Sequence, residues 1–298
     1  MEKALIDLSF VILHFNVIDA TNDLVRSIKT TIKNCKYRII IVDNCSPNKS
    51  GKILYEQYSN DNEVEVVLLN ANKGFARGNN AGIEFVRKNY VCKYICCINN
   101  DTLIFQENFY QLIDEEYKRS NSAVIGPKIL LKDGSYQKSA YRLESLEYYK
   151  KLLTYFSNRK YTDITYNQGM KERIKSSIPF LYVKMKNVKD NLLGNKLLFK
   201  HYNVVLHGCC LIFTPVFFEK LDGFNPKTFL YHEEELLYIS LLKADMKSVY
   251  CPSIKIKHLE DVSTNSVNRT NKEKIEFNNM NEVKSLNVLI RELESSNI

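Results

Sequence analysis

The sequence predicts an α/β fold in which a mostly parallel, doubly wound sheet is covered by helices. The main evidence is an alternation of short apolar runs with helical segments over the first hundred residues. Tyr94–Ile98 is the clearest run, because five consecutive apolar residues are typical of a strand buried on both faces. This strand stops abruptly at Asn99-Asn100-Asp101. Ligands bind beyond the carboxyl ends of strands in open α/β sheets, so this triplet is the first candidate site.

Four strands alternate with helices before Asp101. The first helix places Leu24, Ile28 and Ile32 on one face at four-residue spacing. Such a β-α-β-α-β-α-β order is typical of a parallel sheet. The predicted strands are 8–15, 38–42, 64–69 and 94–98, and the helices are about 20–33, about 49–59 and a third that ends near residue 89.

The second half of the chain continues the same domain after an insertion. The apolar run 204–213 predicts another buried strand, and an amphipathic pattern from Lys272 to Leu293 predicts a final helix. We therefore expect one domain over residues 1–263 and a helical extension over 264–298. The other predicted elements are helices at about 107–119 and 233–242, strands at 123–127 and 247–251, and a hairpin turning at 133–134.

Residues 142–203 differ from the rest in charge. They contain thirteen Lys and Arg and five Asp and Glu, a net charge of +8 that equals that of the whole chain. Aromatic residues such as Tyr148, Tyr155 and Phe180 lie between the charges. This mixture suits a surface that lies on anionic lipid. A helical insertion that packs on the domain explains it equally well, whereas no recognisable motif supports nucleic-acid binding.

The N-terminus and the cysteines predict a cytoplasmic protein. The first residues lack a signal-peptide core and cleavage site, and no apolar run approaches the roughly 18 residues that span a bilayer. The eight cysteines show no C-x-x-C spacing, so zinc or a disulfide framework is not expected. Cys96 and Cys97 lie in an apolar run, where cysteine behaves as a small hydrophobic residue.

Polar clusters follow three of the predicted strands and are expected to share one crevice. They are Asp43-Asn44-Cys45-Ser46, the loop 72–82 and Asn99-Asn100-Asp101. The loop 72–82 supplies glycines for close approach at a helix start, where free N–H groups and the helix dipole favour phosphate. It matches neither G-x-G-x-x-G nor a Walker loop, so a dinucleotide or ATP site is not indicated.

The residues alone leave two interpretations open at each candidate position. Asp101 suits a divalent-cation ligand or the N-cap of a following helix. Asp43 suits a nucleotide contact or a turn-forming carboxylate. Acidic residues at Glu233 and Glu234 are favoured by the helix dipole whatever their function. His258 suits a metal ligand or a hydrogen-bonded structural histidine.

Six motifs in this order resemble the family 2 glycosyltransferases, which are inverting enzymes of GT-A fold. The resemblance is greatest to the bacterial rhamnosyltransferase-like branch that builds capsule and O-antigen. It covers about residues 8–263, interrupted by the basic insertion, and each motif is weak alone. The motifs are 43–46, 72–80, 99–101, Gly223-Phe224, Glu233-Glu234 and His258.

The resemblance implies a role for each motif. Asp43 would contact the base and ribose, and the loop 72–80 would border the nucleotide and its phosphates. Asp101 and His258 would hold Mg²⁺ or Mn²⁺ at the diphosphate. Glu233-Glu234 matches the family's Glu-Asp pair, whose second member is the usual base. The donor-binding positions implied are Asp43, Asn44, Ser46, Asn72, Gly74, Arg77, Asn80 and Asn100.

Two positions depart from the family pattern. Asn99-Asn100 replace acidic residues of the D-x-D motif and leave one carboxylate, although Mg²⁺ can bind with one or two when phosphates contribute. Glu234 replaces the usual Asp and is one methylene longer, a shift of about an ångström that matters in catalysis. Glu233 therefore stays an alternative base, and His207 and His232 are candidates for the acceptor site.

The chemistry expected is direct displacement with inversion. A sugar hydroxyl becomes a nucleophile when a carboxylate takes its proton, and a metal and N–H groups offset the charge of the leaving nucleoside diphosphate. We expect transfer from a UDP- or dTDP-sugar to a saccharide acceptor, lipid-linked at the inner membrane face, in bacterial surface polysaccharide synthesis. The peripheral membrane contact would use the insertion. The alternatives are a sugar-phosphate nucleotidyltransferase and a non-catalytic sugar-nucleotide-binding protein.

Overall fold

Four parallel strands form the half of the sheet that the sequence predicted. In the computed structural model, which describes residues 3–159, 197–259 and 270–296, β1 pairs in parallel with both β2 and β4, and β3 lies outside β2. Strands β1 and β2 are rich in Val, Ile and Leu and largely buried, as expected of strands covered on both faces. The bounds are β1 (Ala4–His14), β2 (Tyr37–Asp43), β3 (Val64–Leu68) and β4 (Tyr90–Asn99).

The second half of the sheet is mixed. Strand β10 runs antiparallel to β4 and to β6, whereas β11 runs parallel to β6 and antiparallel to β5. The order is β3-β2-β1-β4-β10-β6-β11-β5. The remaining strands are β5 (Thr102–Ile104), β6 (Val124–Leu131), β10 (Cys210–Phe213) and β11 (Ser248–His258), with short β7 (Ala140–Tyr141), β8 (His201–Tyr202) and β9 (Val205–Leu206).

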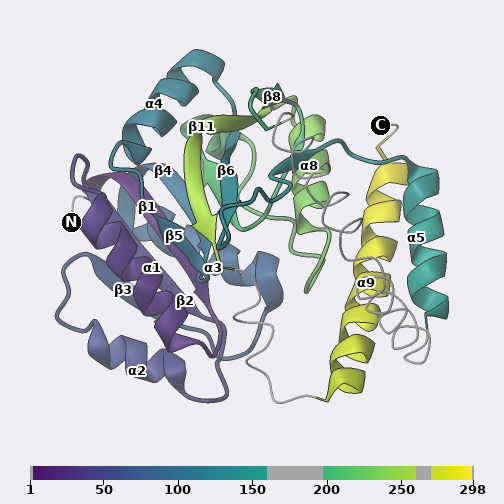
Figure 1. The fold of residues 1–298 in the computed structure, drawn as a ribbon, viewed down its shortest axis with the longest axis horizontal. Coiled ribbons are helices and arrows are strands. Elements are labelled where there is room, and N and C mark those ends of the chain that lie inside the picture. Colours follow the sequence, from purple (N-terminus) through teal and green to yellow (C-terminus); the bar gives the residue numbers. More distant parts are fainter. Residues whose placement is uncertain (1–2, 160–196, 260–269, 297–298) are drawn as a thin grey trace.

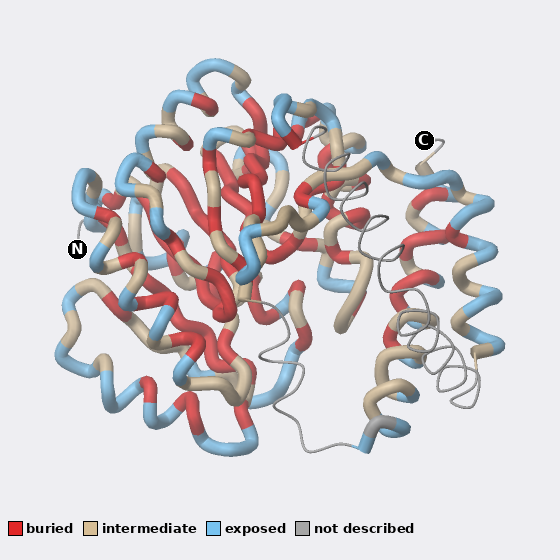
Figure 2. The backbone as a smooth tube through the Cα atoms, in the orientation of Figure 1, coloured by how far each residue is buried: buried red, intermediate tan, exposed pale blue. Residues whose placement is uncertain are grey.

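Helices cover both faces of the sheet, and the strands between them are buried (Figures 1 and 2). One apolar cluster joins the sheet to α1 and α4, and a second joins the other face to α3 and α8. Cys96 and Cys97 belong to these clusters, which confirms their prediction as core residues. The helices of the two faces are α1 (Ile18–Thr31), α2 (Ser50–Gln57), α3 (Gly74–Asn89), α4 (Phe109–Ser120), α8 (Glu233–Lys243) and the 3₁₀ turn η1 (Pro215–Glu219).

The C-terminal helix packs beside α8 and α5. Helix α9 (Asn271–Glu294) lies alongside α5 (Leu146–Asn158), as Figure 1 shows. A third apolar cluster, which includes Tyr149, Leu236 and Leu289, joins the three helices. A capping box between Thr270 and Glu273 closes the first turn of α9. None of the helices in the described parts of the chain is long and apolar enough to cross a membrane.

The predicted glycine loop 72–82 is instead mostly helical, because α3 begins at Gly74. A Cβ atom on Gly78 would lie 2.5 Å from the Leu13 side chain, and one on Gly82 would lie 2.3 Å from Val11. Both glycines therefore allow α3 to pack closely on β1. The prediction that they approach a phosphate is wrong; only Gly74 stands at the helix start.

The predicted hairpin at residues 133–134 forms only its turn. Gly134 has φ +83° and its N–H donates to the Leu131 carbonyl at 3.0 Å. The returning chain makes a single bridge between Leu130 and Tyr136 rather than a strand. The chain then departs to pair β7 with β9, which accounts for the missing second strand.

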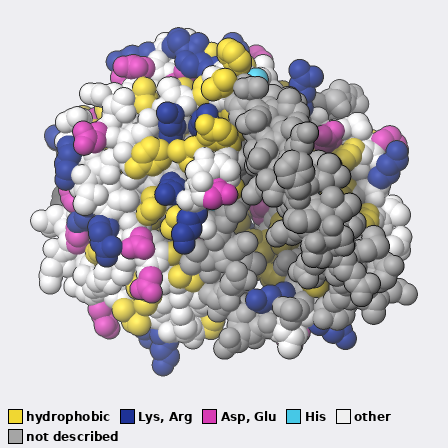
Figure 3. Space-filling view, in the orientation of Figure 1, with side chains coloured by type: hydrophobic (Ala, Val, Ile, Leu, Met, Phe, Trp, Pro, Cys, Tyr) yellow, Lys and Arg dark blue, Asp and Glu magenta, His cyan; other side chains and the backbone are white. Residues whose placement is uncertain are grey.

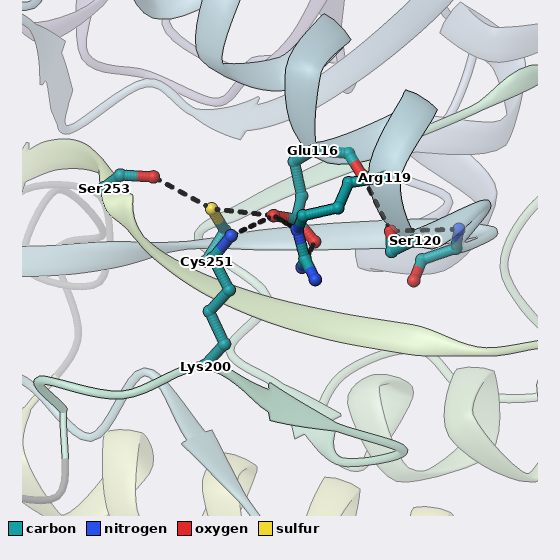
Figure 4. A network of polar contacts seen from close by, with 7 residues as sticks. Glu116, Arg119, Ser120, Lys200, Cys251 and Ser253 are labelled. Atoms are coloured by element: carbon teal, nitrogen blue, oxygen red, sulfur yellow. Dashed lines mark hydrogen bonds and ion pairs between the residues drawn. The ribbon is translucent and has the colours of Figure 1, made fainter.

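The basic insertion predicted over 142–203 lies largely outside the described residues. Its first part forms α5, and the described chain resumes at residue 197. There Lys200 donates to the buried carboxylate of Glu116 on α4 at 2.7 Å, and Arg119 pairs with the same carboxylate (Figure 4). The Cys251 thiol of β11 also points to Glu116 (Figure 4). This network holds the resuming chain against α4 and β11.

We expect the substitution Gly82→Ala to destabilise the protein by about 1–3 kcal/mol, because the added methyl group would overpack the contact with Val11 and Val42. At an unobstructed helix position the same change would stabilise the protein by roughly 0.5–1 kcal/mol, so the sign of the change distinguishes the two situations. Denaturant unfolding measures this change in the free energy of unfolding. The exposed Glu84→Ala on the same helix is the control, and a Gly82→Ala protein as stable as the wild type would contradict the packing argument.

Candidate functional site

A cavity of about 450 Å³ lies at the carboxyl ends of β1, β2 and β4. It occurs where ligand-binding crevices form, beyond the carboxyl ends of the strands of an open α/β sheet. Polar residues from all three predicted clusters meet in its lining, which confirms that the clusters share one crevice. The predicted residues that line it are Asn44, Asn72, Gly74, Asn100 and Asp101.

Asp43 and Ser46 form a tight turn beneath this cavity rather than part of its lining. The Ser46 hydroxyl donates to the Asp43 carboxylate at 2.5 Å and accepts from the Asn16 N–H at 2.9 Å. A Cβ atom on Gly51 would lie 2.1 Å from the same carboxylate, so α2 approaches it closely. The turn-forming interpretation of Asp43 is thus observed. Its contact with a nucleotide stays a prediction.

Asn44 and Gly74 connect the end of β2 to the start of α3. The Asn44 side chain accepts from the Lys73 N–H at 2.8 Å and donates to the Gly74 carbonyl at 3.2 Å. The Phe229 carbonyl accepts from the Phe75 N–H at 2.8 Å and would lie 2.2 Å from a Cβ on Gly74. With φ +77° as well, position 74 requires glycine. The segment 228–232 therefore crosses directly over the start of α3.

Arg77 and Asn80 lie outside the lining of the cavity. The Asn80 amide donates to the Phe224 carbonyl at 2.8 Å and accepts from the Phe224 N–H at 2.8 Å. Asn80 thus joins α3 to the Gly223-Phe224 turn. Arg77 is exposed, and its guanidinium donates to the Lys73 carbonyl at 3.2 Å. Contacts of these two side chains with a nucleotide stay predictions.

Asp101 and His258 meet although 157 positions separate them in the chain. Antiparallel pairing of β5 with β11 places Thr102 opposite His258, and the Leu259 N–H donates to the Asp101 carbonyl at 2.8 Å. The His258 Nε2 atom lies 3.2 Å from Asp101 Oδ1. The sequence prediction that these residues share a site is consistent with this geometry. Because β5 follows Asp101 directly, the alternative that Asp101 caps a helix is wrong.

The Asp101–His258 pair has the donor chemistry of a divalent-cation site. Asp101 Oδ1 is buried and has no hydrogen-bond partner with suitable geometry in the described chain. The His258 Nδ1 atom contacts Gln137 Oε1 at 2.8 Å, an outer-shell contact that would fix the ring with Nε2 facing Asp101. The described residues hold no group of three or more His, Cys, Asp or Glu side chains that could by itself hold a metal ion. Mg²⁺ or Mn²⁺ would therefore take its other ligands from substrate phosphates and water.

His207 lies beside the pair. Its ring centroid is 6.1 Å from that of His258, and its Nδ1 atom accepts from the Cys209 N–H at 3.2 Å. Burial, reinforced by the neighbouring His258, lowers the pKa of His207 to about 4, against the opposing charge of Asp101. The ring is thus neutral near pH 7. His207 thus lies beside the predicted metal pair, and its role at the acceptor site stays a prediction.

The two candidate bases begin helix α8 and face different neighbours. Glu234 accepts from the Gly208 N–H at 3.0 Å, next to His207. Glu233 accepts from the Thr228 hydroxyl at 3.3 Å. Burial and then the adjacent Glu234 raise the pKa of Glu233 to about 8. Burial and then the Glu235 charge raise the pKa of Glu234.

Glu234 and Asp101 both lie near residues 207–209, which lead into β10. Burial raises the pKa of the Cys209 thiol, and the charges of Cys210, Asp101 and Glu234 act further in that direction. Both carboxylates are therefore within electrostatic range of one thiol at the start of β10. Glu234 thus stands near the Asp101–His258 pair, a position that the sequence order could not reveal.

A buried ion-pair network holds the segment before the candidate bases. Tyr231 and His232 both have left-handed backbones, with φ +74° and +64°. The His232 ring lies 3.5 Å from a Glu235 carboxylate oxygen and 3.1 Å from one of Glu282 on α9. These carboxylates outweigh burial and raise the pKa of His232 to about 10. His232 therefore joins α8 to α9, and its role at the acceptor site stays a prediction.

Sequence reasoning missed part of the cavity wall. Helix α9 was predicted from its apolar stripe, which packs on α5 and α8, but polar residues on its other side reach the cavity. The rings of Phe229 and Phe277 lie 6.3 Å apart and join this wall to segment 228–232. No sequence motif marks these positions. The missed lining residues include Phe229, Tyr231, Lys274, Phe277 and Asn278.

The fold is an open α/β sheet with a polar crevice at its strand ends, and sequence comparison identifies its family. The profile described as "Glycosyl transferase family 2" matches residues 9–211, more than half of the chain. The chain belongs to glycosyltransferase family 2. A search of curated proteins found no significant match.

Comparison of structures supports the same fold. A crystal structure of GalNAc-T7 with UDP, GalNAc and Mn²⁺ is similar, with a TM-score of 0.55, 14% identity, and coverage of 87% of this chain and 44% of that one. A structure of S. aureus TarS 1–349 in complex with UDP-GlcNAc has a TM-score of 0.35 and 19% identity, covering 48% and 42%. This chain spans less than half of each of them. The α/β, GT-A-like fold predicted from the sequence is confirmed.

We expect His232→Gln to lower the free energy of unfolding by about 3 kcal/mol at pH 7, because it leaves the buried Glu235 and the partly buried Glu282 without their cation. The pKa of His232 is raised on folding from 6.5 to about 10. Its stabilisation is therefore complete below about pH 6.5 and is lost as the pH rises through 10. Denaturant unfolding of both proteins from pH 6 to 10 tests this.

The matched control is Glu294→Gln, which breaks the exposed Lys150–Glu294 pair between α5 and α9. Surface pairs contribute roughly 0–1 kcal/mol, so this variant should stay near the wild type. The difference in the free energy of unfolding between His232→Gln and the wild type should shrink toward pH 10. If this difference is small at pH 7, or does not change with pH, a charged His232 does not stabilise the fold.

Proposed function

We propose that this chain is a glycosyltransferase that moves a sugar from a nucleotide-sugar donor to a saccharide acceptor, with inversion at the transferred carbon. The observation that supports it most is the Asp101–His258 pair, whose buried Asp101 oxygen lacks a hydrogen bond, at the strand ends of a family 2 domain. The donor would be a UDP- or dTDP-sugar. A structure of similar fold contains UDP, GalNAc and Mn²⁺.

The cavity residues have separate tasks in this proposal. Asn44, Asn72 and Asn100 would hydrogen-bond the nucleotide part of the donor through their amides. Asp101 and His258 would hold Mg²⁺ or Mn²⁺. When bound, the metal offsets the negative charge that develops on the leaving nucleoside diphosphate. Because the phosphates would complete its coordination, one carboxylate suffices on the protein side.

Glu234 is the proposed general base. It stands beside Gly208 and His207, toward the metal pair, whereas Glu233 points to Thr228. A base acts in its carboxylate form, and a raised pKa makes that carboxylate a stronger proton acceptor. The acceptor hydroxyl would lose its proton to Glu234 as its oxygen attacks the sugar carbon. One base and one leaving diphosphate on opposite sides of that carbon give inversion.

The proposed acceptor is a lipid-linked saccharide at the inner face of a bacterial membrane, in capsule or O-antigen synthesis. The supporting observation is the +8 charge of residues 142–203. In the described flanks of this segment, Tyr148, Tyr155 and Phe199 are exposed. Figure 3 shows Lys and Arg side chains among hydrophobic and acidic side chains on one face of the described protein. Such a surface suits anionic lipid.

Release of nucleoside diphosphate from UDP-, dTDP- and GDP-sugars tests the reaction. With Mg²⁺ or Mn²⁺ we expect slow donor hydrolysis from one donor, abolished by EDTA. Asp101→Ala should reduce it at least a hundredfold, because the metal loses its carboxylate. Glu234→Gln should reduce it about 10²–10⁴-fold, because the general base is lost. Glu233→Gln is the matched control for the neighbouring position.

Other outcomes separate the alternative functions. Release of pyrophosphate from a nucleoside triphosphate would favour a nucleotidyltransferase. Donor binding that persists in Glu234→Gln, with no turnover in any form, would favour a non-catalytic binding protein. If calorimetry detects no binding of any donor, the proposal is wrong.

Liposome flotation tests the membrane contact. The purified protein should float with vesicles that contain anionic lipid, less so in high salt, and not with neutral vesicles, because the attraction is electrostatic. Lys151→Glu on α5 should weaken it, whereas the same charge change at Lys88 on α3 should not; both lysines are exposed. Binding that is absent, or independent of salt, would count against this part of the proposal.

A further inference from the structure

Helix α9 is held firmly against the segment that forms one wall of the cavity. Ser285 donates to the Leu230 carbonyl at 2.6 Å, and Glu282 pairs with His232 at 3.1 Å. Farther along the same side of the helix, Phe277 contacts the ring of Phe229. These contacts determine where the first turns of α9 lie. Lys274, Phe277 and Asn278 are thereby placed in the lining of the cavity opposite the strand ends.

Lys274 differs from three other lysines near α9, Lys227, Lys243 and Lys272, in having no acidic partner among the described residues. Lys227 and Lys243 both donate to Glu292 at 2.6 Å, and Lys272 lies 3.9 Å from Glu276. Within the described ranges of the chain, no carboxylate oxygen lies within 4.0 Å of the Lys274 ammonium. Lys274 is also only partly exposed. A half-buried cation without an ion pair favours an anionic ligand in the space it faces.

The rest of the cavity supplies little positive charge of its own. Its polar lining consists mostly of the amides of Asn44, Asn72, Asn99 and Asn100, with Asp101 as its carboxylate and Lys274 as its cation. Its volume of about 450 Å³ equals that of a sphere roughly 10 Å across, about one Debye length at 0.1 M salt. A negatively charged group bound there would lie within range of Lys274.

We propose that Lys274 binds a phosphate group of the nucleoside diphosphate, so that the C-terminal helix completes the donor site from outside the residues matched by the family profile. This inference rests on the proposed function for the identity of the ligand. The ammonium would donate to phosphate oxygens while Asp101 and His258 act on the same diphosphate through a metal. Phe277 and Asn278 form the wall beside it.

This assignment explains how a site with a single carboxylate in place of D-x-D holds a diphosphate. Compared with a D-x-D site, this site has fewer acidic ligands for a metal and therefore less negative charge facing the phosphates. The Lys274 ammonium on α9 adds attraction for the diphosphate without any further metal ligand. In this assignment, the His232–Glu282 contact contributes to the donor site indirectly, because it holds α9 and therefore Lys274 at the cavity.

Calorimetric titration tests the assignment on the full chain with the nucleoside diphosphate selected from UDP, dTDP and GDP and with the matching nucleoside. Lys274→Ala should weaken diphosphate binding about tenfold to a hundredfold, because a hydrogen bond to a charged group is lost. Binding of the nucleoside, which has no phosphate, should be unchanged. Lys274→Arg should keep most of the wild-type affinity for the diphosphate. In Lys274→Ala, the affinity for the diphosphate should depend less on salt concentration than in the wild type.

Lys272→Ala, two positions away on the same helix, is the matched control and should bind like the wild type. If the wild type binds a diphosphate and Lys274→Ala binds it equally well, the role of Lys274 is excluded while the proposed function stands. If Lys274→Ala weakens the binding of diphosphate and nucleoside equally, the substitution disturbs the cavity wall in general. This result would also exclude a role of Lys274 in binding phosphate. If the wild type binds none of the three diphosphates, the proposed function fails as well.

Discussion

The antiparallel pairing of β5 with β11 is the contact on which the candidate site depends. It brings His258 next to Asp101, and the two side chains come from opposite halves of the chain. The parallel half of the sheet ends at Asp101, whereas the mixed half supplies His258, Gly208 and the start of α8. Without this pairing, the buried Asp101 oxygen would have neither His258 beside it nor the Gln137 contact that orients the ring.

A second constraint acts from the C-terminal helix. The ion pairs of His232 with Glu235 and Glu282 hold a segment whose backbone is left-handed at two successive residues. Such conformations persist where the surroundings over-determine them, and they cluster at functional sites. Here the segment leads directly into Glu233 and Glu234. The same contacts fix α9 over the cavity, so one network positions both the candidate bases and the wall with Lys274.

Several features of the site were predictable because they depend on local sequence. The apolar run 94–98 predicted a doubly buried strand, and its polar end predicted the place of the crevice. Asn44, Asn72, Gly74, Asn100 and Asp101 were predicted together and line one cavity. Gly78 and Gly82 were assigned to ligand approach, which was wrong, because a glycine pattern does not distinguish close approach to a phosphate from close approach to a strand.

The sequence by itself determined the alternation of strands and helices in the parallel half, the polar strand ends and the family to which they belong, because these follow from periodicity and short motifs. Only the tertiary structure decided that Asn80 bonds to Phe224, that Glu234 faces Gly208, and that α9 brings Lys274 to the cavity. These facts depend on contacts between segments far apart in the chain. Local patterns specify which face of a helix is apolar, but the neighbours against which it packs determine where its polar residues point.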